Sequence, residues 1–475
     1  MLRKILFILS FLTTTVYAQQ RLMFHNGTFK IAQFTDIHWD EKSPNCPQTI
    51  AAINSVIADE HPDMAMLTGD IVTEKPGVQG WKSIIAIFER ARLPFAVMMG
   101  NHDAEVMDKD SIYTMLLASP YYVGKRGDTD IFGRGNCAIP VYGGQGIEAL
   151  LYCLDSNDYQ PVKEFGHYDW IHFDQIQWYR EQSRRFTQAH AGKPLPALAF
   201  FHIPLVEYKD MLKAGTYLGH YEDEGVASAK LNSGMFNAFA EQGDVMGVFT
   251  GHDHSNDLID TYSTIALAYG RVSGFDAYGK LPRGGRIIQL YEGKRKFDTW
   301  IRAAGKQEDI FYYPSGITSR DEEILPFLAG VDRKPRRQGV AYTYYEGVCK
   351  KISQISHCMP IKSGKLPNFS LAPARIPDHF AFEFRAFIKI DKRGVYKFYT
   401  YSDDGSQLFI DGKLLIDNDG GHSARRVEEK VALEAGYHEI RIPYFEDYMG
   451  QTLEVGYASR DIEETLIPDS VLFVE

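Results

Sequence analysis

The sequence predicts an α/β layered domain followed by an all-β domain. Between residue 29 and about residue 302, short apolar runs alternate with helix-like stretches. From Gly339 onward, helical periodicity disappears and short alternating runs take its place. The chain has 475 residues, of which 44% are hydrophobic and 24% charged, as in ordinary globular proteins. At about 150 residues per domain, this length allows two or three domains.

The first residues have the layout of a cleaved export signal. Met1–Lys4 is a short basic start, Ile5–Val16 is apolar, and Val16-Tyr17-Ala18 offers small residues before a cleavage point. An anchoring helix is the alternative, but the stretch is shorter than the about 20 residues that a membrane span needs. We therefore expect a signal peptide over residues 1–18, a secreted or periplasmic protein, and no membrane span after cleavage.

The first domain is expected over residues 19–302. Short apolar runs predict buried strands at Lys30–Phe34, Met64–Leu67, Phe95–Met99, Pro196–Phe201 and Val245–Phe249. Apolar residues at helical spacing predict helices at Thr49–Asp59, Trp81–Arg92, Tyr168–Ala189 and Met235–Glu241. After Ile265 the pattern has only strands, the clearest at Arg286–Leu290 and Phe297–Ile301.

Residues 303–336 are mixed and polar, and we expect them to form a connector. An extra strand or helix of the first domain is the alternative for Ile310–Ile317. Over residues 337–475, alternating apolar runs are separated by Gly, Asp and Asn turns, and Asp411-Gly412 is a strong hairpin signal. This pattern predicts an all-β barrel or sandwich.

Five cysteines in an exported chain favour a disulfide, with one thiol left over. Cys349 and Cys358 lie close together in one polar stretch, and we expect this pair to be bridged. Cys137 and Cys153 flank a Gly-rich turn almost symmetrically, so a hairpin would place them face to face, and a bridge there is the second alternative. Cys46 would then be the odd thiol.

Five polar clusters each follow a predicted strand of the first domain. They are Asp36-Ile37-His38, Gly69-Asp70, Gly100-Asn101-His102-Asp103, Phe201-His202 and Gly251-His252-Asp253-His254. Each cluster alone is more simply a turn or a structural histidine. Open α/β sheets place ligands outside the carboxyl ends of their strands, so the ordered series predicts one site at that edge.

The residue types in these clusters fit a binuclear metal site. Imidazole nitrogen and carboxylate oxygen suit Zn, Mn or Fe. Asp70 has two oxygens and can bridge two ions. The other expected ligands are Asp36, His38 and His254 on one side, and Asn101, His202 and His252 on the other. Two dications about 3.5–4 Å apart can stabilise both the attacking and the leaving oxygen of an in-line displacement, and they lower the pKa of a bound water. His102 is not needed as a ligand, and it could protonate the departing alkoxide or hold a phosphate oxygen.

The series D-x-H, G-D, G-N-H-D, H and G-H-x-H resembles that of calcineurin-like metallophosphoesterases. More narrowly, the chain resembles a purple-acid-phosphatase-related subgroup of this family at Phe201–Pro204, Asn232–Gly234, Thr250–Asp257 and Ala277–Gly279. This resemblance covers residues 28–302. It implies a four-layer αββα sandwich, Asp70 as the bridging ligand and His102 as the catalytic residue. Purple enzymes have a tyrosine three residues after the bridging Asp, and its phenolate binds Fe(III). Here that residue is Thr73, which puts an Fe(III)–tyrosinate site in doubt.

Three further residues, Asp103, Asp253 and Arg271, are expected to support the ligands or to contact substrate. For Asp253 a turn is the alternative. Tyr269, Arg271 and Tyr278 lie in a Gly-rich stretch and could line the substrate mouth, with a plain surface loop as the alternative.

Val395–Lys413 resembles the β-barrel module first named in anthrax protective antigen, and later segments extend the match over residues 337–475. The resemblance implies carbohydrate binding, in some members through Ca²⁺ held by adjacent aspartates. Asp403 and Asp404 stand in that place, and carboxylate oxygens suit Ca²⁺. The alternative is that these aspartates only cap a turn.

The net charge of −11 and the lack of a basic stripe argue against a nucleic-acid polymer as partner. We expect an exported binuclear-metal phosphoesterase in which water attacks a phosphate ester, with monoesters preferred. It would carry two metal ions and possess a C-terminal module for carbohydrate or cell-surface glycan. One alternative is a phosphodiesterase acting on a nucleotide or a phospholipid head group. The other is a glycan-binding protein whose phosphoesterase domain is a non-catalytic scaffold.

Overall fold

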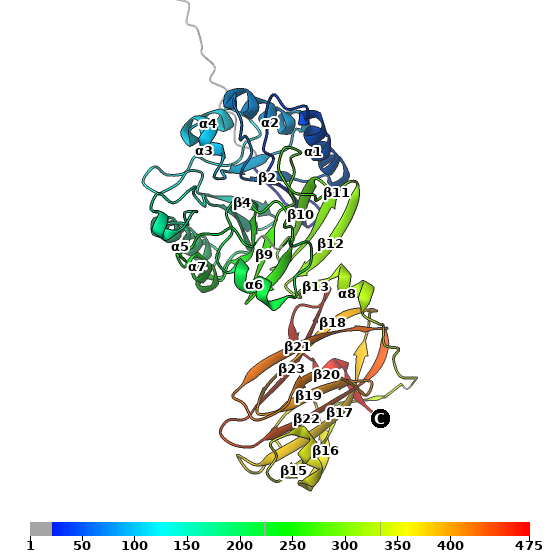
Figure 1. Cartoon of the computed structure of the whole chain (residues 1–475). Helices are drawn as coiled ribbons and strands as arrows, with labels where there is room; N and C mark the ends of the chain where they lie inside the picture. The colour runs from blue at the N-terminus through cyan, green and yellow to red at the C-terminus, as the bar shows by residue number, and fades with distance from the viewer. Residues whose placement is uncertain (1–20, 223–224, 333) are drawn as a thin grey trace, which may run out of the picture.

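The structure is a computed structural model, and it describes residues 21–222, 225–332 and 334–475. The expected signal peptide, residues 1–18, lies outside the described residues. Figure 1 shows two units in chain order, an α/β unit coloured blue to green and a β-rich unit coloured yellow to red. Among the described helices, none combines the length and the apolar character that a membrane crossing requires.

Two β-sheets form the centre of the first unit. The seven-stranded sheet has the order β13 (Ile317–Thr318), β12 (Lys306–Tyr313), β11 (Phe297–Ala303), β10 (Gly284–Tyr291), β1 (Thr28–Phe34), β2 (Met64–Thr68) and β3 (Phe95–Met98). The six-stranded sheet has the order β4 (Cys137–Gly143), β5 (Gly146–Cys153), β6 (Ala197–Phe200), β7 (Val245–Thr250), β9 (Ile265–Tyr269) and β8 (Ile259–Tyr262). Ile31 and Met66 of one sheet share a core with Leu151 and Phe249 of the other.

Helices cover the outer face of each sheet. The helices α1 (Cys46–Glu60), α2 (Gly77–Ala91) and α4 (Lys109–Leu117) pack on the seven-stranded sheet. The helices α5 (Phe173–Ala189), α6 (Tyr208–Ala214) and α7 (Met235–Gln242) pack on the six-stranded sheet. Because β2 is covered on both faces, all five of its residues are buried, which explains its uninterrupted apolar run. These layers confirm the expected αββα sandwich.

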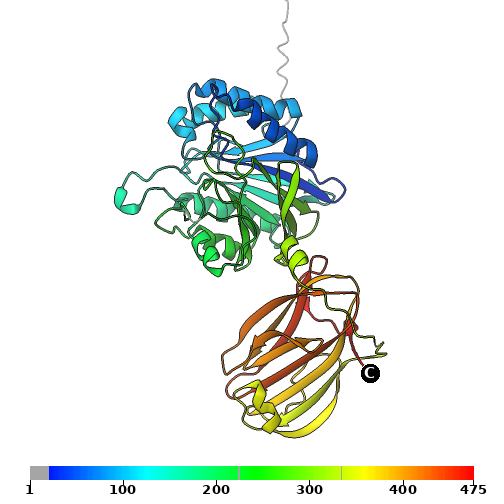
Figure 2. The same cartoon turned by 45° about the vertical axis from the view of Figure 1, so that its right-hand side comes forward.

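The segment between the units begins with strands of the first unit. Ile310–Ile317 forms part of the first unit and not a connector, because β12 and β13 extend the seven-stranded sheet. This was the alternative expected for that stretch. The helix α8 (Ser319–Ile324) follows, and it lies at the junction in both views (Figures 1 and 2). Tyr312 and Ile317 pack against Val395 and Ala432 of the second unit.

The second unit consists of two antiparallel sheets. The larger sheet contains β14 (Arg337–Gln338), β15 (Val340–Glu346), β16 (Met359–Leu366), β17 (Phe380–Ile390), β19 (Ser406–Ile410), β20 (Lys413–Asn418), β22 (Gly436–Glu446) and β25 (Leu472–Val474). The smaller sheet contains β18 (Gly394–Asp403), β21 (Arg425–Leu433), β23 (Thr452–Ser459) and β24 (Thr465–Leu466). The expected hairpin at Asp411-Gly412 joins β19 to β20, and both turn residues have positive φ.

No strand pairing joins these two sheets within the described ranges, so of the two expected forms, barrel or sandwich, the unit has the sandwich form. Closure fails where β20 approaches β21. There the Asn418 side chain bonds the backbone oxygen of Arg425 and accepts from its guanidinium, in place of a backbone ladder.

The structure contains no disulfide bond among the described residues. Cys137 and Cys153 lie directly opposite each other in the β4–β5 hairpin, as the symmetric spacing predicted. The Sγ atoms of Cys349 and Cys358 lie 2.7 Å apart, and a disulfide between them stays a prediction.

Candidate metal centre

The expected ligands follow strands that end at one edge of the two sheets. β1, β2 and β3 are parallel, as are β5, β6, β7 and β9. Sharp turns follow these strands, with positive φ at Asp36, His38, Asp70 and His252. A Cβ atom on Gly69 would lie 2.4 Å from Nδ1 of His202, so only glycine allows this close approach.

One cluster contains Asp36, His38, Asp70 and His254, whose ligand atoms all lie within 4.8 Å of one another. The Nε2 atoms of His38 and His254 are 3.1 Å apart. Nε2 of His254 lies 3.3 Å from Oδ1 of Asp36, and Nε2 of His38 lies 3.7 Å from Oδ2 of Asp70. Nitrogen and carboxylate oxygen atoms therefore converge on one point, as a transition-metal site requires.

A second cluster contains Asp70, His202 and His252. Nε2 of His202 lies 3.2 Å from Oδ2 of Asp70, and 3.2 Å from Nδ1 of His252. Nδ1 of His202 lies 2.7 Å from the backbone oxygen of Thr68, which favours a proton on Nδ1 and directs Nε2 to the cluster. Asp70 belongs to both clusters, which is the position expected of a bridging ligand.

Asn101 and His102 lie beside Asp70. The backbone N–H of His102 donates to Oδ1 of Asp70 at 2.9 Å. Asn101 is buried, and its Oδ1 has no hydrogen-bond partner among the described residues. An orphaned buried oxygen and two pairs of facing ring nitrogens are unfavourable without a cation, so these residues fit a binuclear metal centre.

The pKa values of the histidines also suit metal binding. Burial lowers the pKa of His38 to about 4, and burial with the neighbouring His202 lowers that of His252 to about 3. Both imidazoles are therefore neutral and available as ligands. Burial alone would lower the pKa of His202, but its contact with Asp70 raises it to about 10. An incoming metal ion would displace the proton that His202 holds.

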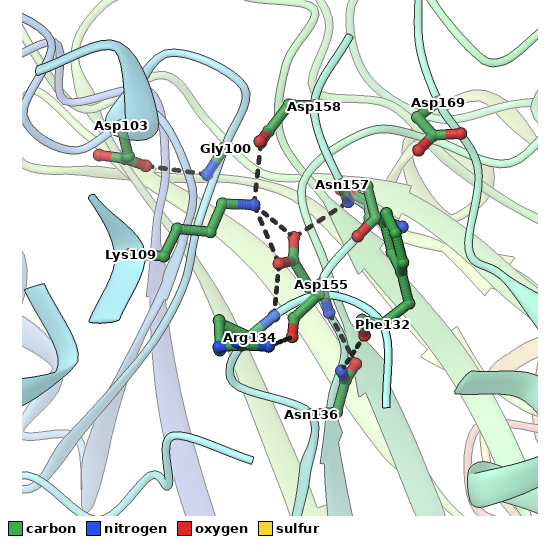
Figure 3. Close-up of polar contacts among 12 residues, drawn as sticks. Gly100, Asp103, Lys109, Phe132, Arg134, Asn136, Asp155, Asn157, Asp158 and Asp169 are labelled. Atoms are coloured by element: carbon green, nitrogen blue, oxygen red, sulfur yellow. Dashed lines mark hydrogen bonds and ion pairs between the residues drawn. The ribbon is translucent and has the colours of Figure 1, made fainter. Parts of the chain in front are cut away.

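Asp103 and Asp253 support the ligand loops. The Asp103 carboxylate accepts from the backbone N–H groups of Ile71, Val72 and Gly100, at 2.9, 3.0 and 2.8 Å. It thereby ties the Asp70 loop to the Asn101 loop, and Figure 3 shows its bond to Gly100. Asp253 lies between His252 and His254 in the sequence, and its carboxylate accepts a hydrogen bond from the Tyr269 hydroxyl at 2.7 Å.

The expectations for Tyr269 and Arg271 at the substrate mouth, or in a surface loop, are wrong. Both side chains are fully buried, because Tyr269 ends β9 and Arg271 is ion-paired with the buried carboxylate of Asp257. Arg271 therefore supports the turn that carries His254. Tyr278, by contrast, is 55% exposed and stacks on the His254 ring with a centroid distance of 3.9 Å.

Residues of the 155–172 loop also reach the site, and no motif singled them out. Tyr159 contacts Asn101 and His102, and the ring of Tyr168 meets that of His252 edge to face at 4.5 Å. A signal was present, because Asp155 follows the end of β5 at the same sheet edge as the other clusters.

Two further groups of donors lie away from this centre. His220, Asp257 and Asp309 form one, although Arg271 already supplies a cation to Asp257. Asp403, Asp404 and Glu446 form the other.

Known proteins resemble both units. A family model described as calcineurin-like phosphoesterase matches residues 29–256, and a PA14 domain model matches residues 338–470. "Probable inactive purple acid phosphatase 29" of Arabidopsis thaliana is 31% identical over 311 residues, 58% of this chain and 80% of that protein. "Phosphatase DCR2" of Saccharomyces cerevisiae is 28% identical over 344 residues, 63% of this chain and 58% of that protein. A solved dimetal phosphatase from Danio rerio is 12% identical, with a TM-score of 0.44, over 60% of this chain and 99% of that one.

Proposed function

The chain belongs to the calcineurin-like phosphoesterase family, and on that basis we propose that it hydrolyses phosphate esters, preferably monoesters, with two metal ions. The observation that carries the proposal is the pair of donor clusters that share Asp70. Their nitrogen and oxygen donors suit Zn, Mn or Fe. Two bound ions would supply a nucleophile by acidifying water and would neutralise charge on the phosphate.

His102 is the residue that we assign to proton transfer. Its side chain is 38% exposed, and its ring centroid lies 5.7 Å from that of His38. Nδ1 of His102 is 3.2 Å from Oε2 of Glu105, which favours a proton on Nδ1. To protonate the departing alkoxide of the substrate, the ring must carry a second proton on Nε2, which it gives up while Nδ1 keeps its own.

Substitution of Asp70 tests this function. Asp70→Asn removes an anionic oxygen from both clusters, so phosphate release from an aryl phosphate should fall by at least about 100-fold. The control is Asp210→Asn, which changes a surface carboxylate that is 50% exposed, and it should retain activity. A faster reaction with an aryl diester would favour the phosphodiesterase alternative. No turnover of either ester with Zn, Mn or Fe supplied would overturn the proposal and favour the scaffold alternative.

We also propose that the PA14 domain binds glycan through Ca²⁺. Asp403, Asp404 and Glu446 place their ligand atoms within 4.8 Å of one another. Oε1 of the buried Glu446 has no hydrogen-bond partner in the part of the chain that the structure describes. Burial and the charge of Asp404 raise the pKa of Glu446 to about 8. Three crowded carboxyl groups would be stabilised by a hard cation.

The two candidate sites lie at opposite ends of the molecule. Across the sheet, the register of β12, β11, β10 and β1 places Tyr313 in line with Phe29, near the start of β1. Asp36 follows the opposite end of β1. The second unit therefore docks at the sheet edge away from the metal ligands. β18 runs from this junction for ten residues, about 30 Å, before it reaches Asp403. This separation supports a tethering role for the PA14 domain, with no part in the reaction.

Export is part of the proposal, because a tether for cell-surface glycan is useful only outside the cell. The basic and apolar start of the sequence supports it. Recovery of a mature chain that begins near Gln19 from the periplasm or the medium would bear this out. Recovery of the full-length chain from the cytoplasm alone would contradict it.

A further inference from the structure

Tyr159 touches two residues of the metal centre without being a ligand itself. Nδ2 of Asn101 donates to Oη of Tyr159 at 2.9 Å. The same Oη lies 3.4 Å from Nδ1 of His102. One hydroxyl group therefore contacts both the expected amide ligand and the expected proton donor.

The contact with Asn101 decides how its amide is oriented. A side-chain amide has one oxygen and one nitrogen, and only the oxygen can bind a metal ion. Because Tyr159 takes up Nδ2, Oδ1 is the atom left buried without a partner. Without the hydroxyl, the amide would lose the bond that sets this orientation.

A buried polar group anchors the loop that carries Tyr159 (Figure 3). Nζ of Lys109 lies 3.1 and 2.9 Å from the two carboxylate oxygens of Asp155, and 2.9 Å from Oδ1 of Asp158. Asp155 is fully buried and also accepts from the backbone N–H groups of Arg134 and Asn157, at 2.7 and 2.9 Å. The chain is therefore fixed at 155–158, directly before Tyr159.

Aromatic rings also contact the Tyr159 side chain. Its ring centroid lies 5.1 Å from that of His167 and 6.0 Å from that of Tyr168. Tyr168 in turn packs against the ligand His252. Tyr159 is 36% exposed, so its position rests on the anchored backbone before it, on these ring contacts and on the bond from Asn101.

We propose that Tyr159 is a positioning residue of the metal centre, which holds the Asn101 amide with Oδ1 toward the metal and steadies the ring of His102. The buried group of Lys109, Asp155 and Asp158 holds Tyr159 in turn. This inference rests on the proposed metal centre but not on the identity of the substrate.

Tyr159→Phe tests the proposal, because it removes the hydroxyl and keeps the ring. Zn²⁺ binding to the metal-free full chain, measured by competition with a chromogenic chelator, should weaken by about 10- to 100-fold at one of the two positions. With an aryl phosphate, kcat should fall while KM stays within about twofold. The urea midpoint should not change. Tyr217→Phe is the matched control, since that ring contacts Tyr221 and not the metal centre, and both constants should match the wild type.

A double-mutant cycle separates positioning from general damage. If Tyr159 acts through Asn101, Tyr159→Phe should have no further effect on Zn²⁺ affinity in an Asn101→Ala background. Additive losses, or a Tyr159→Phe protein that binds both Zn²⁺ ions as the wild type does, would overturn the inference. If Zn²⁺ affinity falls as expected but neither protein turns over any ester, the positioning role stands and the proposed hydrolysis fails.

Discussion

Replacement of Arg271 by methionine should destabilise the first domain by about 3–5 kcal/mol. The side chains of Arg271 and Asp257 are both fully buried, and Nε of Arg271 donates to Oδ2 of Asp257 at 2.6 Å. Methionine keeps a long apolar stem but leaves the buried carboxylate without its cation. The same carboxylate ends the turn that carries His254, so Zn²⁺ affinity should fall as well.

Tryptophan fluorescence during urea denaturation measures this loss in the first domain alone. All five tryptophans of the chain lie between Trp39 and Trp300, so the second domain contributes no tryptophan signal. Lys213→Met is the control, because it breaks an ion pair whose side chains are 76% and 50% exposed. That change should cost less than about 1 kcal/mol.

The pH dependence provides a second check. Burial would raise the pKa of Asp257, but bonds from His220 and Arg271 lower it from 3.8 to about 2. At about 1.4 kcal/mol for each pKa unit, this gives about 2.5 kcal/mol of stability, present above pH 3.8 and lost as the pH falls toward 2. Without Arg271 the carboxylate should take up a proton at higher pH, so the difference between wild type and variant should narrow from pH 7 to pH 4. A loss below 1 kcal/mol at pH 7, or a gap that widens on acidification, would refute this reasoning.

Gly274→Ala should weaken Zn²⁺ binding at least about tenfold. The new Cβ would lie 1.6 Å from the backbone oxygen of Ile37, so the backbone between the expected ligands Asp36 and His38 would have to move. Competition with a chelator measures the Zn²⁺ affinity, and Gly394→Ala is the control because its Cβ would meet no atom within 4 Å. Equal Zn²⁺ affinities in the two variants would contradict this prediction. Ca²⁺ affinity should rise about tenfold for each pH unit up to about pH 8, because Ca²⁺ must displace the proton on Glu446, whose pKa burial and Asp404 raise to about 8. Calorimetry in buffers of different ionisation enthalpy measures the proton release, and pH-independent or absent Ca²⁺ binding would contradict the assignment.

The metal centre was predictable because its ligands obey a local rule. Parallel strands end at one edge of a sheet, so polar residues directly after β1 and β2 meet there, and the packing of the two sheets brings the residues after β7 to the same edge. Short turns leave little freedom after a strand, and Asp36, Asp70 and His254 therefore lie where the strand order places them.

Tyr159 was not predictable in this way, and for Arg271 only a role in supporting the ligands or contacting substrate could be named, because long-range contacts fix both residues. The position of Tyr159 depends on Lys109, which lies on a separate helix, 50 residues earlier in the chain. Glycines near Arg271 suggested a loop, and only its pairing with Asp257 explains why a cation is buried there. The open sandwich has the same cause, since closure depends on whether two distant strand edges pair.

We expect the threonine at position 73 to affect which metal ions bind more than it affects the proposed hydrolysis. Three relatives from Arabidopsis thaliana carry the word "inactive" in their names, whereas this chain brings together both clusters that share Asp70. A tyrosine at position 73 would add a phenolate, an anionic oxygen donor that favours trivalent iron. Without it, the donors are imidazole, carboxylate and one amide, and these suit divalent Zn or Mn. Because His102 and Asp70 do not depend on a phenolate, activity should be sought first with divalent ions, and the Asp70→Asn comparison then decides whether the centre is catalytic.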